Sequence, residues 1–327
     1  MKYARRITVA VMAAALAAAG PALPTAAAEP TTAAEPTSLP ALLDSMGPSP
    51  AGANDLDCVP SPEHPRPVVL VHGTRMDMTG TWAVAAPQLA DLGYCVYALN
   101  YGGIRSLVDP ELMVWGVGSI EDSAKQVGEF VDAVLTHTGA DQVDLVGHSQ
   151  GGPVSRQYLR FEGGADPADP DRNKVDKLVM LGATNHGTTF NGLQQLYSLF
   201  ARLGLGNQEW ATERLAQMVF GIAGHQQLTG SRVLARLNSG AETLPGIEYT
   251  SIATRQDTVA TPPENAFLQP SENSVVHNVW LEDACPTSPA DHLALLELPE
   301  SLHLVKSALD PQYAETVPAP CTAPPAG

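Results

Sequence analysis

The sequence predicts an α/β fold in which a mostly parallel central sheet is flanked by helices. From residue 67 onward, short apolar runs alternate with longer amphipathic stretches, and this alternation is typical of strand–helix–strand units. The run over residues 67–71 is continuous, without alternating polar residues, which indicates a strand buried on both faces. We expect one domain of this kind over residues 51–327.

Five apolar runs have the length of buried strands, and they span 67–71, 94–99, 143–146, 177–181 and 247–253. Helices are expected at 81–92, 119–137 and 153–161. The second helix would have Val127, Val131 and Val134 on one face and Ser119 as its cap. Because the carboxyl ends of parallel strands meet at one edge, the residues that follow four of the strands should lie together: Thr74, Ser149, Asn185 and Asp257.

The first 28 residues have the pattern of a cleaved secretory signal. Three basic residues precede an uncharged apolar run over 7–19, and three alanines follow at 26–28. The alternative is a membrane anchor, but the run is shorter than the roughly 20 residues that a bilayer needs. The Arg5-Arg6 pair leaves twin-arginine export open beside the general route. Residues 29–50 are expected to form a flexible leader, with a short helix near Leu42.

Cleavage would make the chain more acidic and leave all four cysteines in the exported part. The removed residues carry three basic and no acidic side chains, so the formal charge moves from −17 to −17 − 3 = −20. Nucleic acid repels so acidic a chain, and we expect no nucleic-acid partner. An even number of cysteines in an exported chain predicts two disulfides. Of the three connectivities we favour the sequence neighbours, Cys58–Cys95 and Cys285–Cys321.

A candidate nucleophile lies between the strand expected at 143–146 and the helix expected at 153–161. The segment Gly147-His148-Ser149-Gln150-Gly151 matches G-x-S-x-G, a sharp turn that lifts the serine hydroxyl above the sheet and needs small residues on both sides. The alternative is a glycine-rich turn with a buried, inert serine. We predict that Ser149 is the nucleophile, and its hydroxyl then needs a neighbouring base to accept the proton.

The base is expected to come last in the order serine, acid, histidine. Three histidines meet this condition: His277, His292 and His303. We predict His292, because it stands in a loop that Cys285 ties back and that can present the edge of the ring. His277 lies in an alternating strand, and His303 lies in a terminal helix, where we expect it on the surface. His148, beside the serine, is expected to point away.

The acid is expected at the end of a late strand. Asp257 meets this condition and is predicted to hold the imidazole in the tautomer that accepts a proton. Asp144 and Asp176 begin strands, at the opposite edge of the sheet. Asp283 is the alternative, and Asp291 is expected to cap the helix that begins beside it.

Acyl transfer from a nucleophilic serine forms an oxyanion, which needs preorganised hydrogen-bond donors. One donor is expected from the backbone N–H of Gln150, directly after the nucleophile. The second is expected from Thr74, which follows the first strand and the flexible Gly73. The alternative for His72-Gly73-Thr74 is an ordinary tight turn.

Residues 186–240 do not fit the alternation, and we expect them to form a helical cap over the edge of the sheet. Their apolar residues include Leu196, Leu199, Phe200 and Leu203, which cover more than one narrow stripe of a helix. A cap that is apolar on both faces would pack on the sheet with one face and line an acyl pocket with the other. The alternative is packing alone.

Several motifs together resemble the secreted bacterial triacylglycerol lipases of the class 2 lipase/esterase type, in the α/β-hydrolase superfamily, and more distantly the fungal lipase B group. The resemblance covers about residues 40–325, includes all four cysteine positions and rests on these segments: His72-Gly73-Thr74, Gly147-His148-Ser149-Gln150-Gly151-Gly152, Asn185-His186-Gly187-Thr188, Gln227-Leu228-Thr229-Gly230-Ser231, the stretch from Asp257 through Val259 to Pro262, and Asp291-His292. It implies ester hydrolysis without a cofactor, with Thr74 and Gln150 at the oxyanion-hole positions. Relatives often have a cysteine near Gln226, where this chain reads Gly224-His225.

The resulting expectation is a secreted carboxylic-ester hydrolase, most of all a triacylglycerol lipase, that acts through Ser149, Asp257 and His292 and an acyl-enzyme. Its partner would be a lipid or another small ester, with transient contact to a lipid surface, and we expect a monomer. No metal or cofactor is expected, because the cysteines form no C-x-x-C pair and the histidines lack ligand spacing. The alternatives are a small-ester or polyester esterase, a serine peptidase or amidase, and a non-catalytic binding module.

Overall fold

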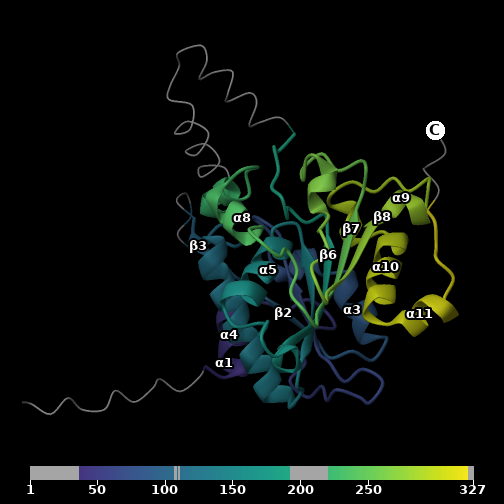
Figure 1. The fold of residues 1–327 in the computed structure, drawn as a ribbon. Helices are drawn as coiled ribbons and strands as arrows, with labels where there is room; N and C mark the ends of the chain where they lie inside the picture. The colour runs from purple at the N-terminus through teal and green to yellow at the C-terminus, as the bar shows by residue number, and fades with distance from the viewer. Residues whose placement is uncertain (1–36, 107–108, 110, 192–219, 323–327) are drawn as a thin grey trace, which may run out of the picture. The chain divides into compact units, whose positions relative to one another are not determined.

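Six strands form the central sheet of the computed structural model (Figure 1). Their order is β2-β1-β5-β6-β7-β8, with the bounds β1 Val68–Val71, β2 Val96–Leu99, β5 Val143–His148, β6 Val175–Leu181, β7 Glu248–Ala253 and β8 Val275–Trp280. Every neighbouring pair is parallel. The expected α/β fold is therefore confirmed, and each of the five expected strands is present. A separate antiparallel pair consists of β3 (Ile104–Arg105) and β4 (Met113–Val114).

The structure describes residues 37–106, 109, 111–191 and 220–322. The expected signal at 1–28 and the first part of the expected leader lie outside the described residues. So do residues 192–219, which make up the middle of the expected cap. No helix in the described part of the chain combines the length and the apolar character that a membrane span requires.

Helices cover both faces of the sheet. α4 (Ile120–Thr138) and α5 (Gly151–Phe161) lie on one face, whereas α3 (Ala85–Ala90) and α10 (Pro299–Leu309) lie on the other (Figure 1). The shorter elements are α1 (Leu39–Met46), α2 (Met78–Thr81), α8 (Arg232–Leu237), α9 (Leu281–Ala284), α11 (Pro311–Thr316) and the 3₁₀ turns η1 (Pro170–Arg172), η2 (Pro263–Ala266) and η3 (Ala294–Leu296). The helix expected at 81–92 is divided into α2 and α3. Asp77 caps α2 by accepting the Gly80 N–H at 2.8 Å, and the buried Trp82 follows its end.

The apolar character of the strands and of α4 matches their burial. Every residue of β1, β2 and β5 is buried. α4 buries Val127, Val131 and Val134, and its expected cap is present, since Ser119 Oγ accepts the Asp122 N–H at 3.1 Å. Full burial of one such side chain contributes roughly 1.5–3 kcal/mol. Packing of this face against the sheet therefore stabilises the helix more than its intrinsic propensity does.

Packed structure begins within the expected leader, before residue 51. α1 forms where a short helix was expected, and its Leu39 side chain is only 2% exposed. The amide of Asn100, directly after β2, donates to the Met46 carbonyl at 2.7 Å. α1 also contacts α4. This part of the leader is thus attached to the domain.

Both favoured disulfides are present. Cys58–Cys95 joins the loop before β1 to the start of β2, and Cys285–Cys321 joins the end of α9 to the C-terminal segment. A disulfide that closes a loop of moderate length typically stabilises a domain by about 2–4 kcal/mol. The second disulfide also anchors the loop that follows α9, and this loop contains His292.

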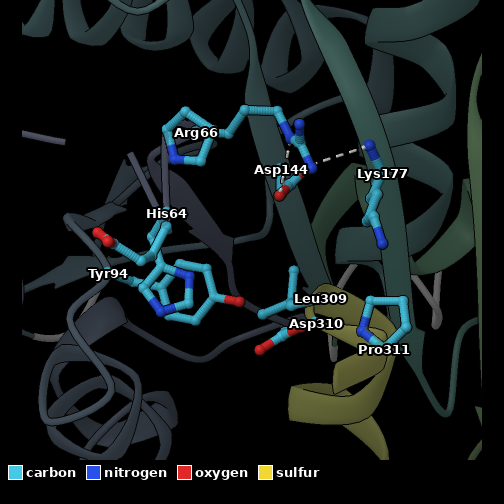
Figure 2. Close-up of a pocket in the computed structure, with 10 residues that line it drawn as sticks. His64, Arg66, Tyr94, Asp144, Lys177, Leu309, Asp310 and Pro311 are labelled. Carbon is cyan, nitrogen blue, oxygen red and sulfur yellow. Dashed lines mark hydrogen bonds and ion pairs between the residues drawn. The ribbon is translucent and has the colours of Figure 1, made fainter. Parts of the chain in front are cut away.

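A polar cavity of about 170 Å³ opens at the edge of the sheet where β1 and β5 begin. Figure 2 shows Arg66 beside Asp144, with Arg66 Nε 3.2 Å from Asp144 Oδ1. The same carboxylate oxygen accepts the backbone N–H of Lys177 at 3.1 Å. Burial of Asp144 raises its pKa to about 7, although the Arg66 charge opposes the shift. As expected from the sequence, Asp144 lies at the edge opposite to the carboxyl ends of the strands.

Candidate active site

Four of the candidate residues follow neighbouring strands at one edge of the sheet. Thr74 follows β1, Ser149 follows β5, Asn185 follows β6 and Asp257 follows β7. These strands are adjacent in that order and run in parallel, so their carboxyl ends meet at this edge. The structure therefore brings together the four segments that were expected to meet.

Ser149 occupies a strained turn between β5 and α5. Its φ is 54°, in the left-handed region that residues with a side chain seldom adopt. Its N–H donates to the Leu181 carbonyl at 2.9 Å, which holds the turn against the end of β6. Gly151 is required two residues later, because a Cβ there would collide with the carbonyl oxygen of Val71. The close approach of helix and strand thus explains the glycine in the motif.

His292 and Asp257 form a buried pair. His292 lies between α9 and η3, and its Nδ1 is 2.7 Å from Asp257 Oδ2. The other carboxylate oxygen, Oδ1, accepts the N–H groups of Val259 and Ala260, each at 2.8 Å. One oxygen therefore fixes the orientation of the carboxylate, and the other fixes the imidazole. A proton on Nδ1 that is donated to Asp257 leaves Nε2 free to accept another.

Gly182 connects the Ser149 turn with the His292–Asp257 pair. It follows Leu181 directly, at the point where β6 ends beside Ser149. Its φ is 54°, and a Cβ there would lie 3.1 Å from His292 Nδ1 and 3.3 Å from Asp257 Oδ2. The backbone of Gly182 is therefore in contact with the pair on one side and close to the turn on the other. Gly182 was not among the residues expected at the site, although a glycine directly after a strand at the candidate edge was a usable signal.

His148 does not point away, contrary to expectation. The centroid of its ring is 4.8 Å from that of His292, and its Nε2 is 3.1 Å from the His292 carbonyl oxygen. Burial lowers the pKa of His148 to about 3, so the ring is neutral and its Nε2–H donates to that carbonyl. His148 thereby holds the backbone of the loop that carries His292.

The loop after β1 lies next to the Ser149 turn. A Cβ on Gly73 would lie 3.2 Å from Ser149 Cβ, and Thr74 Oγ1 donates to Gln150 Oε1 at 2.7 Å. The backbone N–H groups of Thr74 and Gln150 donate to no carbonyl within the described residues. Two such donors beside a serine on a strained turn can stabilise an oxyanion at that serine.

The alternative histidines lie away from this cluster. His277 is on the edge strand β8, where its side chain is 53% exposed and its Nε2 is 3.2 Å from Glu248 Oε1. His303 was expected on the surface of a terminal helix, and this expectation is wrong. It is buried in α10, with its ring 5.3 Å from that of Tyr313, because α11 packs back over this side of α10.

The alternative acids have structural contacts. Asp283 is exposed, and its Oδ1 is 2.7 Å from Arg255. Asp291 caps the turn after His292, as its Oδ1 accepts the Ala294 N–H at 2.9 Å.

In the part of the chain that the structure describes, no group of three or more His, Cys, Asp or Glu side chains is arranged to hold a metal ion.

The described ends of the expected cap are attached to the domain. Thr188 and Leu228 form an isolated parallel bridge, and the rings of Phe190 and Phe220 stack at 4.6 Å. The helix α8 that follows packs against α5. The segment 192–219 between these ends lies outside the described residues, so the expected acyl pocket stays a prediction.

Known sequences related to this chain are lipases. The chain matches the family model for lipase (class 2) over residues 65–283, which is more than half of its length. A triacylglycerol lipase from Pseudarthrobacter phenanthrenivorans is 36% identical over 95 residues, which cover 28% of this chain and 27% of that protein. This chain thus spans about a quarter of the length of the curated relatives that it matches.

Two lipases of known structure share the fold of this chain. Aspergillus fumigatus lipase B has a TM-score of 0.60 at 19% identity, and the match covers 91% of this chain and 66% of that chain. The mature form of Bacillus licheniformis lipase BlEst2 has a TM-score of 0.51 at 16% identity, over 79% of this chain and 96% of that chain. These likenesses show an α/β-hydrolase fold, and the family model spans both the Ser149 turn and Asp257. By fold and by sequence, the chain belongs to the class 2 lipase family.

Proposed function

We propose that the chain is a secreted carboxylic-ester hydrolase in which Ser149 is the nucleophile, His292 the general base and Asp257 the residue that orients it. The observation that carries this proposal is the 2.7 Å contact between His292 Nδ1 and Asp257 Oδ2, at the edge of the sheet where Ser149 also lies. An imidazole held through Nδ1 leaves Nε2 to accept the serine proton. Membership of a lipase family supports the same class of reaction.

The proposed reaction has two steps. Ser149 Oγ attacks the ester carbonyl carbon while His292 Nε2 takes the hydroxyl proton, and the carbonyl electrons move to oxygen. The backbone N–H groups of Thr74 and Gln150 stabilise this oxyanion. When the tetrahedral intermediate collapses, the ester C–O bond breaks and His292 gives its proton to the leaving alcohol. Water then attacks the acyl-enzyme, with His292 again as base, and the carboxylic acid leaves Ser149.

Triacylglycerols are the proposed substrate class. The curated relatives are named triacylglycerol lipases. Leu293, directly after His292, is 56% exposed, and Ile222 is 51% exposed in the segment that leads to Gln227 and its contact with Thr74. Exposed aliphatic side chains in the segments that carry residues of the site suit an acyl chain or a lipid surface better than a polar substrate. Contact with the lipid surface would be transient, and the monomeric state stays a prediction.

Export from the cell is part of the proposal. Both disulfides are typical of exported proteins, because the cytosol keeps most thiols reduced. The basic and apolar pattern of residues 1–28 supports the same conclusion.

A fluorophosphonate probe tests the nucleophile. Wild-type protein should be labelled at Ser149, and Ser149→Ala should not be labelled. Turnover of an aryl ester should fall at least about a thousandfold in the variant, with no loss of folding, because only the attacking hydroxyl is removed. Labelling at another residue, or near-wild-type turnover in the variant, would contradict the assignment.

A series of p-nitrophenyl esters tests the substrate class. We expect kcat/KM to rise from the acetate toward medium or long acyl chains, by up to about 0.8 kcal/mol for each buried methylene, and emulsified triglyceride to be hydrolysed. A preference for acetate would indicate a small-ester esterase. Faster hydrolysis of a matched anilide would indicate an amidase. Folded protein that the probe does not label would indicate a non-catalytic binding module.

A further inference from the structure

The carboxamide of Gln227 contacts four groups beside the candidate oxyanion hole, and all but the half-buried Thr74 belong to buried residues. Its Nε2 is 2.8 Å from Thr74 Oγ1 and 3.3 Å from Gln150 Oε1, and it donates to the Ala223 carbonyl at 3.1 Å. Its Oε1 accepts a hydrogen bond from Thr184 Oγ1 at 2.9 Å. Gln227 is 1% exposed, so water cannot take the place of these partners.

The neighbours of Gln227 fix the orientation of its amide. The Ala223 carbonyl can only accept a hydrogen bond, so the amide atom that faces it must be Nε2. Oε1 then faces the Thr184 hydroxyl, which donates to it. One Nε2 proton goes to Ala223, and the other is shared between Thr74 Oγ1 and Gln150 Oε1. The Thr74 hydroxyl therefore accepts from Gln227 and sends its own proton to Gln150 Oε1 at 2.7 Å.

We propose that Gln227 is a positioning residue for the oxyanion hole, and this inference rests on the proposed function. Within the described residues, Gln150 Nε2 is buried without a hydrogen-bond partner. The Gln150 side chain is therefore held through Oε1 alone, by Thr74 and Gln227. Gln227 contacts the side chains of both residues whose backbone N–H groups would stabilise the oxyanion. It thus holds the two donors at a fixed separation.

Gln227 comes from a distant part of the chain, 153 positions after Thr74. Its backbone is also anchored, because its carbonyl accepts the Thr188 N–H at 2.8 Å. The helical residues before it pack on the loop after β4, where the Ala223 N–H is 3.4 Å from the Val117 carbonyl. The separation of the two donors thus depends on how this segment, at the base of the expected cap, packs on the sheet edge.

The test compares Gln227→Leu with Gln226→Leu. Gln226 is a matched control from the same segment, but its amide contacts the Ile120 N–H at 2.6 Å and Glu121 at 2.8 Å, at the start of α4. We expect Gln227→Leu to lower kcat for an aryl ester about 10- to 100-fold, with KM changed less than about twofold. Gln226→Leu should leave both constants within about twofold of wild type. Tm measurements establish that both variants fold.

Gln227→Glu separates positioning from a general structural role. An ionised carboxylate cannot donate to Thr74 and repels the oxyanion, whereas a protonated carboxyl group can donate. The kcat of this variant relative to wild type should therefore rise as the pH falls through the titration of the introduced carboxyl group. Wild type is the reference at each pH, because all other groups of the site are the same in both proteins. A structural defect alone would give a ratio that does not depend on pH.

A double-mutant cycle with Thr74→Val completes the test. This change removes the hydroxyl but keeps the backbone N–H. Because Thr74 and Gln227 contact each other and both hold Gln150 Oε1, the effects of Thr74→Val and Gln227→Leu on kcat should not be additive. Additive effects, equal losses for the Gln226 and Gln227 variants, or a pH-independent ratio for Gln227→Glu would each overturn the proposal. Fluorophosphonate labelling of Ser149 is measured in parallel. Labelled variants with wild-type kcat refute the positioning role alone, whereas wild-type protein that is not labelled refutes the proposed function.

Discussion

Replacing Asp257 with asparagine should keep the fold and remove most of the turnover. Asp257 Oδ1 accepts the N–H groups of Val259 and Ala260 at 2.8 Å, and the carbonyl oxygen of an asparagine can accept both. The amide nitrogen then replaces Oδ2, 2.7 Å from His292 Nδ1. Two N–H donors cannot hydrogen-bond to each other, so the imidazole must release the Nδ1 proton and carry one on Nε2.

The Nε2–H tautomer cannot take a proton from Ser149. The corresponding change in a serine protease lowers kcat about 10⁴-fold, which equals roughly 5 kcal/mol in the activation barrier. We expect a loss of this order here, because the side chains of His292 and Asp257 are only 6% and 2% exposed. Water therefore has little access to replace the lost acceptor.

Asp283→Asn is the matched control, because Asp283 is 64% exposed and pairs with Arg255 at the surface. Such pairs contribute at most about 1 kcal/mol. Measurement of kcat, KM and Tm on wild type and both variants should show a large fall in kcat for Asp257→Asn alone, with all three proteins folded. If Asp283→Asn is the damaging change, or if Asp257→Asn keeps more than about a tenth of the turnover, the acid is misassigned.

Three further predictions concern stability and the frame of the site. Burial raises the pKa of Asp144 to about 7, so its stabilising contribution is fully present below about pH 4 and is lost as the pH rises through 7, by up to about 4 kcal/mol. Asp144→Asn should therefore flatten the decline in unfolding free energy between pH 5 and 8. Denaturation curves recorded at several pH values would contradict this if the unfolding free energy of both proteins fell equally with pH. Gly182→Ala should lower kcat at least about tenfold, because the added Cβ would lie only 3.1 Å from His292 Nδ1 and displace the ring. A variant with wild-type kinetics would refute the contact. Selective reduction of Cys285–Cys321 should lower activity before the protein unfolds, because this disulfide anchors the loop of His292. If activity falls only together with the circular dichroism signal, the disulfide does not position this loop.

The strands could be predicted because buried strands are rich in apolar residues, and this pattern is visible in the sequence. β1 and the second half of β6, from Leu178 to Leu181, are continuous apolar runs, and both strands are buried along nearly their whole length. The helix expected at 81–92 could not be placed correctly from its apolar pattern. Its start depends on the Asp77 side chain, which caps a turn four residues before Thr81, and capping of this kind overrides a periodicity that spans only three turns.

The candidate reacting groups could be predicted because each stands at the end of a strand or on a loop next to a recognisable motif. Ser149 and Asp257 follow strands, and their contacts lie close to those strand ends. The residues that act through others could not be found in this way. His148 contacts the carbonyl of a residue 144 positions away, and Gln227 contacts Thr74 across 153 positions. Local sequence patterns do not encode side-chain directions over such separations.

β5 has a titrating carboxyl group at its beginning and the candidate nucleophile directly after its end. Asp144 borders the cavity of Figure 2, and Ser149 lies five residues further along the chain. At roughly 3.3 Å per residue, the strand separates them by about 16 Å. A substitution of Asp144 therefore changes the pH dependence of stability at a place that does not contact the reacting groups. The pH range in which the fold is stable and the pH range in which the protein turns over substrate can consequently diverge in evolution, through substitutions at opposite ends of one strand.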